Sequence, residues 1–145
     1  MIALIQRVNY ARVVIEGQRF SEIGRGILAL IGIEKEDNNS TAEKLLERIL
    51  SYRIFPDEEK KMNLSVRDIN AGLMLVSQFT LAASTDKGLR PSFSAGKPPA
   101  QAEEIFNHLV NYADTSYQKI AAGQFAANMQ IALENDGPVT FYLRL

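Results

Sequence analysis

The stretch LMLVSQFTLA, residues 73–82, begins as an apolar run and becomes polar halfway along its length. An apolar run that follows a glycine is typical of a strand covered on both faces of its sheet. We expect the whole stretch to form one long buried strand. Because side chains alternate along a strand, its polar half would be divided between two faces, with Ser77, Phe79 and Leu81 on one and Gln78, Thr80 and Ala82 on the other.

The polar half of this stretch has two interpretations. Polar side chains are costly to bury without partners, so they either meet each other across the sheet or line a pocket. The plainer interpretation is a structural strand in which Thr80 reflects β-propensity alone. The residue types by themselves leave both open.

Six further strands and two helices are predicted around this stretch. Residues 1–33 are expected to form three strands, with a hairpin turn at 16–19 and a second apolar run at 27–33. Short strands are expected at 53–55, 128–133 and 139–145, the last two joined by the turn sequence NDGP. The first helix should begin at a capping box formed by Ser40 and Glu43, and the second at Pro98-Pro99.

Both predicted helices are amphipathic, with apolar residues three and four positions apart. Their buried faces are Ala42, Leu45, Leu46, Ile49 and Leu50 in the first helix, and Ala102, Ile105, Phe106, Leu109 and Ala113 in the second. Since neighbouring strands are mostly joined by short turns, we expect an α/β fold of the α+β kind, with largely antiparallel sheets and two outer helices. A length of 145 residues fits a single domain, 1–145.

The composition excludes several kinds of chemistry. The chain has no cysteine, which removes disulfides, cysteine-ligated zinc and thiol catalysis. Its one histidine, His108, lies on the second predicted helix with no sequence partner for a catalytic triad, and one histidine cannot form a multi-histidine metal site. We therefore expect no metal and no cofactor. The beginning of the chain lacks the features of a signal peptide, and no run is long enough to span a bilayer, so we expect a cytoplasmic protein without membrane contact.

A basic loop with an aromatic residue follows the polar stretch. Lys87, Arg90 and Lys97 flank Phe93 in residues 83–99. A solvated loop is the ordinary interpretation of such charges. The functional alternative is a cradle for phosphates with a stacked base at a single-stranded end. A net charge of −1 means that any contact with nucleic acid would be local.

The sequence NDGPVT, residues 135–140, is dense in turn residues. Its Gly137-Pro138 bond is of the kind that adopts the cis form at modest cost, about 0.5–1 kcal/mol. Together with SQFTLA at 77–82, this motif resembles the pair of motifs of the D-aminoacyl-tRNA deacylases. Five other segments resemble the family in the same order: MIALIQRV (1–8), YRIF (52–55), KMNL (61–64), GLRPSF (88–93) and GQFAANM (123–129). Asn128 departs from the pattern, which has an aspartate there.

The resemblance implies a barrel-like fold and a homodimeric editing enzyme with active sites at the interface. Its substrate would be the 3′ acceptor end of tRNA carrying a D-amino acid, or glycine attached in error. Gly137 and Pro138, joined by a cis bond, would reach into the partner's pocket and exclude L-amino acids as a chiral filter. The backbone N–H groups of Phe79 and Thr80 would stabilise the oxyanion, and the 2′-hydroxyl of the tRNA would assist hydrolysis.

The resemblance also implies roles for other residues. Ser77, Gln78, Phe125 and Met129 would bind the substrate, the last two as walls of an adenine pocket, although plain core packing explains those two equally well. Lys87, Arg90 and Lys97 would bind tRNA. Two other functions remain open at this point: a nucleic-acid-binding module that has lost hydrolysis, and an esterase with Thr80 as nucleophile. A threonine nucleophile needs a base, and the sequence offers none beside it.

Overall fold

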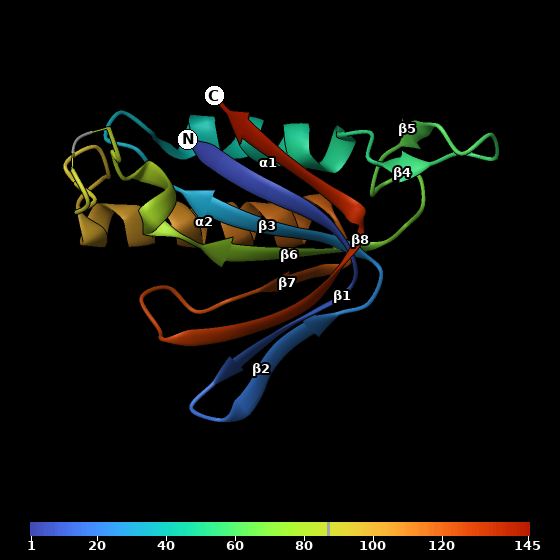
Figure 1. Cartoon of the computed structure of the whole chain (residues 1–145), viewed down its shortest axis with the longest axis horizontal. Helices are drawn as coiled ribbons and strands as arrows, with labels where there is room; N and C mark the ends of the chain where they lie inside the picture. Colours follow the sequence, from blue (N-terminus) through green and yellow to red (C-terminus); the bar gives the residue numbers. More distant parts are fainter. Residues whose placement is uncertain (87) are drawn as a thin grey trace.

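The computed structural model describes residues 1–86 and 88–145. Among these residues the main sheet has six strands in the order β2-β1-β3-β6-β7, with β8 paired to β1. The strands are β1 (Ile2–Ile15), β2 (Gln18–Ile23), β3 (Gly26–Gly32), β6 (Gly72–Ser77), β7 (Ile120–Ala122) and β8 (Met129–Arg144). A small hairpin of β4 (Phe55–Pro56) and β5 (Met62–Leu64) extends from one end of the molecule (Figure 1).

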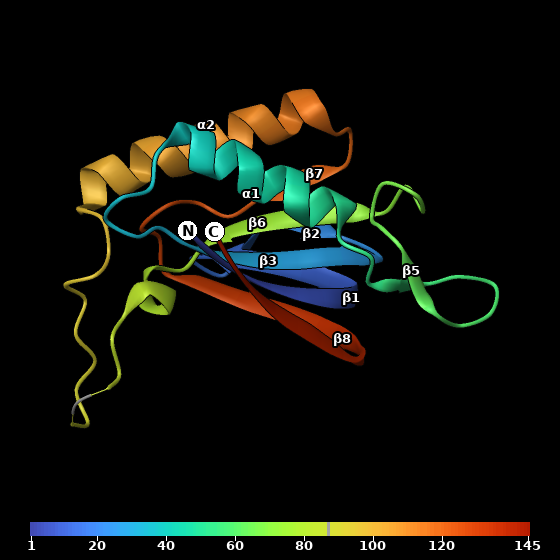
Figure 2. The same cartoon turned by 90° about the horizontal axis from the view of Figure 1, so that it is seen from above.

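Both helices, α1 (Asn39–Ser51) and α2 (Pro99–Ser116), cover the same face of the sheet (Figure 2). Their buried residues are those that the periodicity predicts, so the amphipathic assignment is confirmed. The predicted capping box is wrong. The N-cap is Asn38, two residues before Ser40, because its side chain accepts a hydrogen bond from the Thr41 N–H at 3.1 Å, and the helix begins at Asn39.

The sheet is mixed, and its two halves differ in direction. β1 pairs antiparallel with β2, β3 and β8, as the short turns predict. β3 pairs parallel with β6, and β6 parallel with β7. The chain between β3 and β6 passes through α1, and the chain between β6 and β7 passes through α2. Parallel strands need such crossover connections, and the sequence prediction did not connect the helices with strand direction.

Two apolar cores lie on the two faces of the sheet. The larger lies between the sheet and the helices and includes Phe55 and Phe106. The smaller is enclosed by the curved sheet itself and includes Val13, Met74 and Val76. The Ser21 hydroxyl donates to the Ala122 carbonyl at 2.8 Å and ties β2 to β7. The sheet therefore forms a nearly closed barrel with two helices outside, which confirms the predicted fold class.

No helix in the part of the chain described is long and apolar enough to cross a membrane.

The parallel sheet begins with a close contact between two glycines. Gly26 of β3 pairs with Gly72 of β6. A Cβ placed on Gly26 would overlap the Gly72 carbonyl oxygen and lie 2.7 Å from its carbonyl carbon. Because the obstacle is backbone, no side-chain rotation can relieve it. The two strands approach closely enough to pair here only because Gly26 has no side chain.

We therefore expect Gly26→Ala to lower the free energy of unfolding by about 3 kcal/mol or more, since overpacking against backbone costs about 1–3 kcal/mol or more. Gly24→Ala is the matched control, because a Cβ there meets no atom within 4 Å, and it should change stability by less than about 1 kcal/mol. Urea unfolding of both variants measures the difference. Equal stability of the two would contradict the proposed backbone contact.

Candidate active site

The carboxyl ends of three parallel strands meet at one edge of the sheet. β3, β6 and β7 run in the same direction, so the segments that follow them lie together at this carboxyl edge. The segment after β6 contains Gln78 and Thr80, and the segment after β7 contains Phe125. Figures 1 and 2 both place these two segments at the same end of the sheet. The fold thus brings together SQFTLA and the GQFAANM loop.

The polar half of residues 73–82 is not a strand. β6 ends at Ser77, and residues Phe79–Ala82 form a short 3₁₀ helix, η1. The predicted alternation of faces across Ser77–Ala82 is therefore wrong. The cause lies in the partner strand: the Gln78 N–H still bonds to Ile31 at 2.7 Å, but β3 ends at Gly32. A Cβ on Gly32 would lie 2.9 Å from the Leu81 Cβ, so η1 folds back over the end of β3.

This change of direction turns the motif outward. Ser77 and Gln78 are half-buried, whereas Phe79 and Thr80 are exposed. The Gln78 Nε2 donates to the Thr80 hydroxyl oxygen at 2.5 Å. A lone pair of that oxygen is thereby engaged, and its proton is free to be donated elsewhere.

The chain's single imidazole is engaged at the contact between the two helices. His108 lies on α2, and its Nε2 is 2.8 Å from a carboxylate oxygen of Glu43 on α1. Its ring stacks on that of Tyr112. None of the hydrogen bonds or ring contacts found for His108 among the described residues involves Thr80.

Two backbone N–H groups at the start of η1 have no hydrogen-bond partner among the described residues. The first N–H groups of a helix have no acceptor inside it. Among the described residues, the Phe79 and Thr80 N–H groups take part in none of the backbone or side-chain hydrogen bonds, whereas the next one, of Leu81, bonds to Gln78. Adjacent free N–H groups on exposed residues can stabilise a developing negative charge on a carbonyl oxygen.

The GQFAANM segment packs against both cores. The Phe125 ring lies 6.0 Å from that of Phe106 and joins the core beneath the helices. Met129 packs on the barrel core, and its sulfur would lie 2.6 Å from a Cβ on Gly123. Both side chains remain partly exposed. They contact different cores, so core packing accounts for part of each, and their predicted role as walls of an adenine pocket stays a prediction.

The NDGPVT motif forms a bulge and not the turn of a hairpin. The predicted strands 128–133 and 139–145 are one strand, β8, both halves of which pair with β1. Gln6 pairs with Thr140 and Val8 with Asn135, so five steps along β8 oppose two along β1. The extra residues project from the sheet edge, and the Gly137-Pro138 bond in them is cis.

Side chains from both strands hold this bulge. The Val139 N–H donates to the Asn135 side-chain oxygen at 2.7 Å, and the Asn135 amide donates to the Thr140 hydroxyl at 2.9 Å. Arg7 of β1, only 11% exposed, donates from Nε to the Asp136 carbonyl at 3.0 Å and lies 3.1 Å from its carboxylate.

A second contact of Arg7 fixes its position. Its Nη1 donates to the Ile54 carbonyl at 2.8 Å, which anchors the guanidinium to the segment before β4. Sequence reasoning missed Arg7, although a lone arginine inside the apolar run MIALIQRV is a recognisable signal. The bulge is therefore held in place by a half-buried cation.

Within one chain, the SQFTLA and NDGPVT motifs lie at opposite ends of the sheet. Ser77 pairs with Ile31, which pairs with Ala3 of β1. The bulge faces β1 at Arg7, four residues further along, which is roughly 13 Å at the rise of a β-strand. β1 and β3 also separate β8 from β6 in the sheet. Figures 1 and 2 show η1 at one end of the molecule and the bend of β8 at the other.

Charged groups support the carboxyl edge near β3. The Met1 amino group lies 2.7 Å from the Asp37 carboxylate and 3.2 Å from Glu34, and Arg144 lies 2.6 Å from Glu34. Burial acts to raise the pKa of Glu34, but hydrogen bonds from Arg144 and the Met1 amino group outweigh it and lower that pKa below its ordinary value. Glu34 is thus ionised at neutral pH and anchors both ends of the chain.

The predicted tRNA-binding cations occupy different settings. Lys87 lies outside the described residues. Arg90 is exposed, while the Lys97 Nζ donates to the Lys35 carbonyl at 2.6 Å. Within the residues that the structure describes, no group of three or more His, Cys, Asp or Glu side chains could hold a metal ion.

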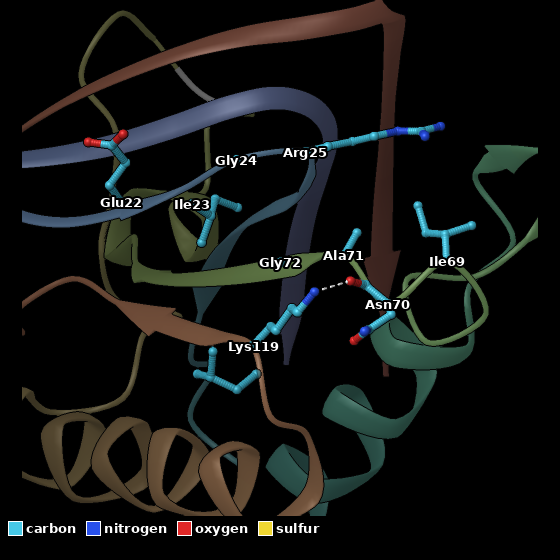
Figure 3. Close-up of a pocket in the computed structure, with 10 residues that line it drawn as sticks. Glu22, Ile23, Gly24, Arg25, Ile69, Asn70, Ala71, Gly72 and Lys119 are labelled. Carbon is cyan, nitrogen blue, oxygen red and sulfur yellow. Dashed lines mark hydrogen bonds between the residues drawn. The ribbon is translucent and has the colours of Figure 1, made fainter.

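Two hollows lie away from the motifs. One, of about 480 Å³, is lined by residues that include Arg25, Asn70, Gly72 and Lys119 at the amino ends of β6 and β7, where Lys119 donates to the Asn70 carbonyl (Figure 3). The other, of about 440 Å³, lies near the start of α1 and includes Lys97. Neither of these two hollows is lined by SQFTLA or NDGPVT residues.

The chain is similar to known deacylases over its full length. The chain is 54% identical over 145 residues to the D-aminoacyl-tRNA deacylase of Haemophilus influenzae (strain PittGG), with both chains covered completely. It is 54% identical over 143 residues to that of Pseudomonas aeruginosa (strain LESB58), covering 99% of each.

Two solved structures share the fold. The c-Myc DNA unwinding element binding protein is 40% identical, with a TM-score of 0.95 over 100% of this chain and 99% of that one. A probable eukaryotic D-amino acid tRNA deacylase has a TM-score of 0.85 at 13% identity, covering 98% and 97%, and supports the fold alone. The family model described as D-Tyr-tRNA(Tyr) deacylase matches residues 4–144, and the chain therefore belongs to this deacylase family.

Proposed function

We propose that this enzyme hydrolyses the ester that joins a D-amino acid, or wrongly attached glycine, to the terminal adenosine of tRNA, and that it rejects L-aminoacyl-tRNA by shape. Family membership supports the deacylase activity. The observation that carries the finer proposal is the separation of two backbone elements, the free N–H groups of Phe79 and Thr80 at one edge and the Gly137-Pro138 bulge at the other. They can act on one substrate only if two copies of the chain meet.

The proposed assembly is a homodimer. In it, the bulge of one copy enters the carboxyl edge of its partner, and two-fold symmetry gives two equivalent sites. The carbonyl oxygens of Gly137 and Pro138 would accept hydrogen bonds from the substrate's amino group. The bulge would also fill the space that an L side chain requires, whereas a D side chain would point away into solvent.

Rejection of L-aminoacyl-tRNA by this bulge requires that the bulge is rigid. Discrimination by a clash is strong only against a rigid obstacle. The contacts of Arg7 with Asp136 and Ile54, and of Asn135 with Val139, supply that rigidity. Glycine has no side chain to collide, so mischarged glycyl-tRNA would enter.

The proposed chemistry relies on backbone groups of the enzyme and on the substrate's own hydroxyl. Water adds to the ester carbonyl carbon, and the oxyanion that forms accepts hydrogen bonds from the Phe79 and Thr80 N–H groups. The 2′-hydroxyl of the terminal adenosine relays the water's proton to the departing 3′-oxygen as the ester C–O bond breaks. The products are a free amino acid and tRNA with a 3′-hydroxyl. Ser77, Gln78, Phe125 and Met129 position the terminal adenosine, while Arg90, Lys97 and Lys87 attract phosphates.

The proposed function is tested by three substrates offered in parallel: D-tyrosyl-tRNA, L-tyrosyl-tRNA and a simple amino acid ester. We expect rapid loss of the D form alone. Binding of tRNA without hydrolysis of any of the three substrates would indicate a nucleic-acid-binding module. Cleavage of the simple ester would indicate that the enzyme has a nucleophile of its own. Release of free tyrosine is the measurement.

Thr80→Ala should reduce kcat/KM for D-tyrosyl-tRNA by no more than about tenfold, because it removes one hydrogen bond worth about 0.5–1.5 kcal/mol and leaves the backbone donors in place. Single-turnover hydrolysis measures this. A nucleophile would behave differently, since its removal costs about 10⁴-fold or more. A loss of that size with an unchanged melting temperature would restore Thr80 as the attacking group.

Arg7→Ala should release the bulge. We expect kcat/KM for D-tyrosyl-tRNA to fall by about 10²-fold, which is the effect of a small misplacement of a binding group. We also expect a smaller ratio of kcat/KM for D-tyrosyl-tRNA to kcat/KM for L-tyrosyl-tRNA. Arg12→Ala is the matched control on the same strand, because its ion pair with Glu22 is exposed and contributes little. Unchanged stereoselectivity in a folded Arg7→Ala protein would remove the bulge from the proposed filter.

A further inference from the structure

Two exposed aromatic rings lie against each other beside the candidate site. Phe79 is 66% exposed and Phe93 is 47% exposed. Their ring centroids are 5.1 Å apart and their planes are inclined by 52°. Large aromatic side chains bury extensive surface when they pack in a core, yet these two leave much of theirs in solvent. The function proposed above uses only the backbone of Phe79, so both rings remain without a role.

The backbone holds Phe93 in this position. Ser84 and Ser92 exchange two backbone hydrogen bonds of 2.8 and 2.9 Å. On the other side of Phe93, the Lys35 N–H bonds to Ala95 and the Lys97 N–H bonds to Ile33, both at 3.1 Å. The segment is therefore anchored to the end of β3, which the charges around Glu34 secure. Preorganised rings of this kind lose little freedom when they bind a flat ligand.

We propose that Phe79 and Phe93 form a stacking platform for the base that precedes the terminal adenosine of the tRNA acceptor end. The inference rests on the proposed function, in which the ester carbonyl lies at the Phe79 and Thr80 N–H groups. Phe79 carries both one of these N–H donors and one of the two rings, and the Phe93 ring lies against the Phe79 ring. The acceptor end is single-stranded, and unpaired bases stack readily on aromatic side chains.

Charge favours a nucleotide over an apolar peptide as the occupant. Arg90 is exposed in the same segment and belongs to none of the ion pairs found among the described residues. A stacked base would bring its phosphate beside this guanidinium. The enzyme would then bind the acceptor end at the nucleotide that precedes the reacting ester. This contact would not depend on the identity of the base, because every base has an aromatic face.

A double-mutant cycle between enzyme and substrate tests this platform. Phe93→Leu keeps an apolar side chain but removes the ring, and Phe93→Tyr keeps the ring. The substrates are D-tyrosyl RNA minihelices with either cytosine or an abasic residue before the terminal adenosine. Phe20→Leu is the matched control, because Phe20 is 51% exposed on β2, outside the candidate site.

We expect Phe93→Leu to raise KM for the cytosine substrate by about 5- to 100-fold, the loss that follows removal of one base stack, with little change in kcat. The abasic substrate should raise KM of the unaltered enzyme by a similar factor, and combining the two changes should add almost nothing. Phe93→Tyr and Phe20→Leu should behave as the unaltered enzyme does.

Three results would overturn the platform. If Phe93→Leu and the abasic residue raise KM independently, so that the two factors multiply, the Phe93 ring and the base are not in contact. A changed molecular mass of Phe93→Leu in light scattering would assign the rings to a contact between copies. A loss that follows the amino acid, present for D-tyrosyl but absent for D-alanyl RNA, would assign them to the substrate side chain. If the unaltered enzyme hydrolyses neither minihelix, the proposed function fails, and the same cycle measured as Kd by fluorescence anisotropy still decides on the platform.

Discussion

The parallel pairing of β3, β6 and β7 is the constraint on which the rest of the site depends. It places the segments after three strands at one edge, and it requires the two crossover helices that cover the larger core. The close contact of Gly26 with Gly72 at the amino ends sets the distance between the first two of these strands. At the carboxyl ends, the earlier termination of β3 allows η1 to fold over it. The N–H groups of Phe79 and Thr80 that have no hydrogen-bond partner are thus a product of strand length as much as of the SQFTLA sequence.

Much of the fold follows from the sequence, because periodicity reports burial. The faces of α1 and α2 were predicted residue by residue, since spacing of three and four is a direct property of a helix packed on one side. Strand direction was harder to predict, because it depends on the path between strands and not on their residues. The end of β6 at Ser77 was missed for a similar reason: Phe79 and Leu81 have the side chains of a strand, and only the length of the neighbouring strand excludes it.

The site shows the same division between local and non-local information. Ser77 to Thr80 and Gly137-Pro138 were identified because their motifs are contiguous in the sequence. Arg7 was not, since its contacts with Asp136 and Ile54 join residues more than forty positions apart. The hairpin expected at NDGPVT became a bulge because both flanking segments pair with β1, a choice of partner that turn residues cannot specify. Phe125 and Met129 show the limit of motif reasoning, because each contributes to a core as well as to the edge.

In the proposed mechanism the reacting surface is made largely of peptide groups, and this has a consequence for how the enzyme can change over evolution. Every amino acid except proline carries the same N–H group, so most single substitutions at Phe79 or Thr80 leave the donors themselves intact. Under this proposal, activity is buffered against ordinary point mutation at the two residues assigned to the ester. Loss or alteration of specificity is expected instead from insertions, deletions and changes in strand length, which move the main chain. Lineages that diverge in substrate choice should therefore differ in loop lengths around η1 and β8 more than in the identity of the residues there.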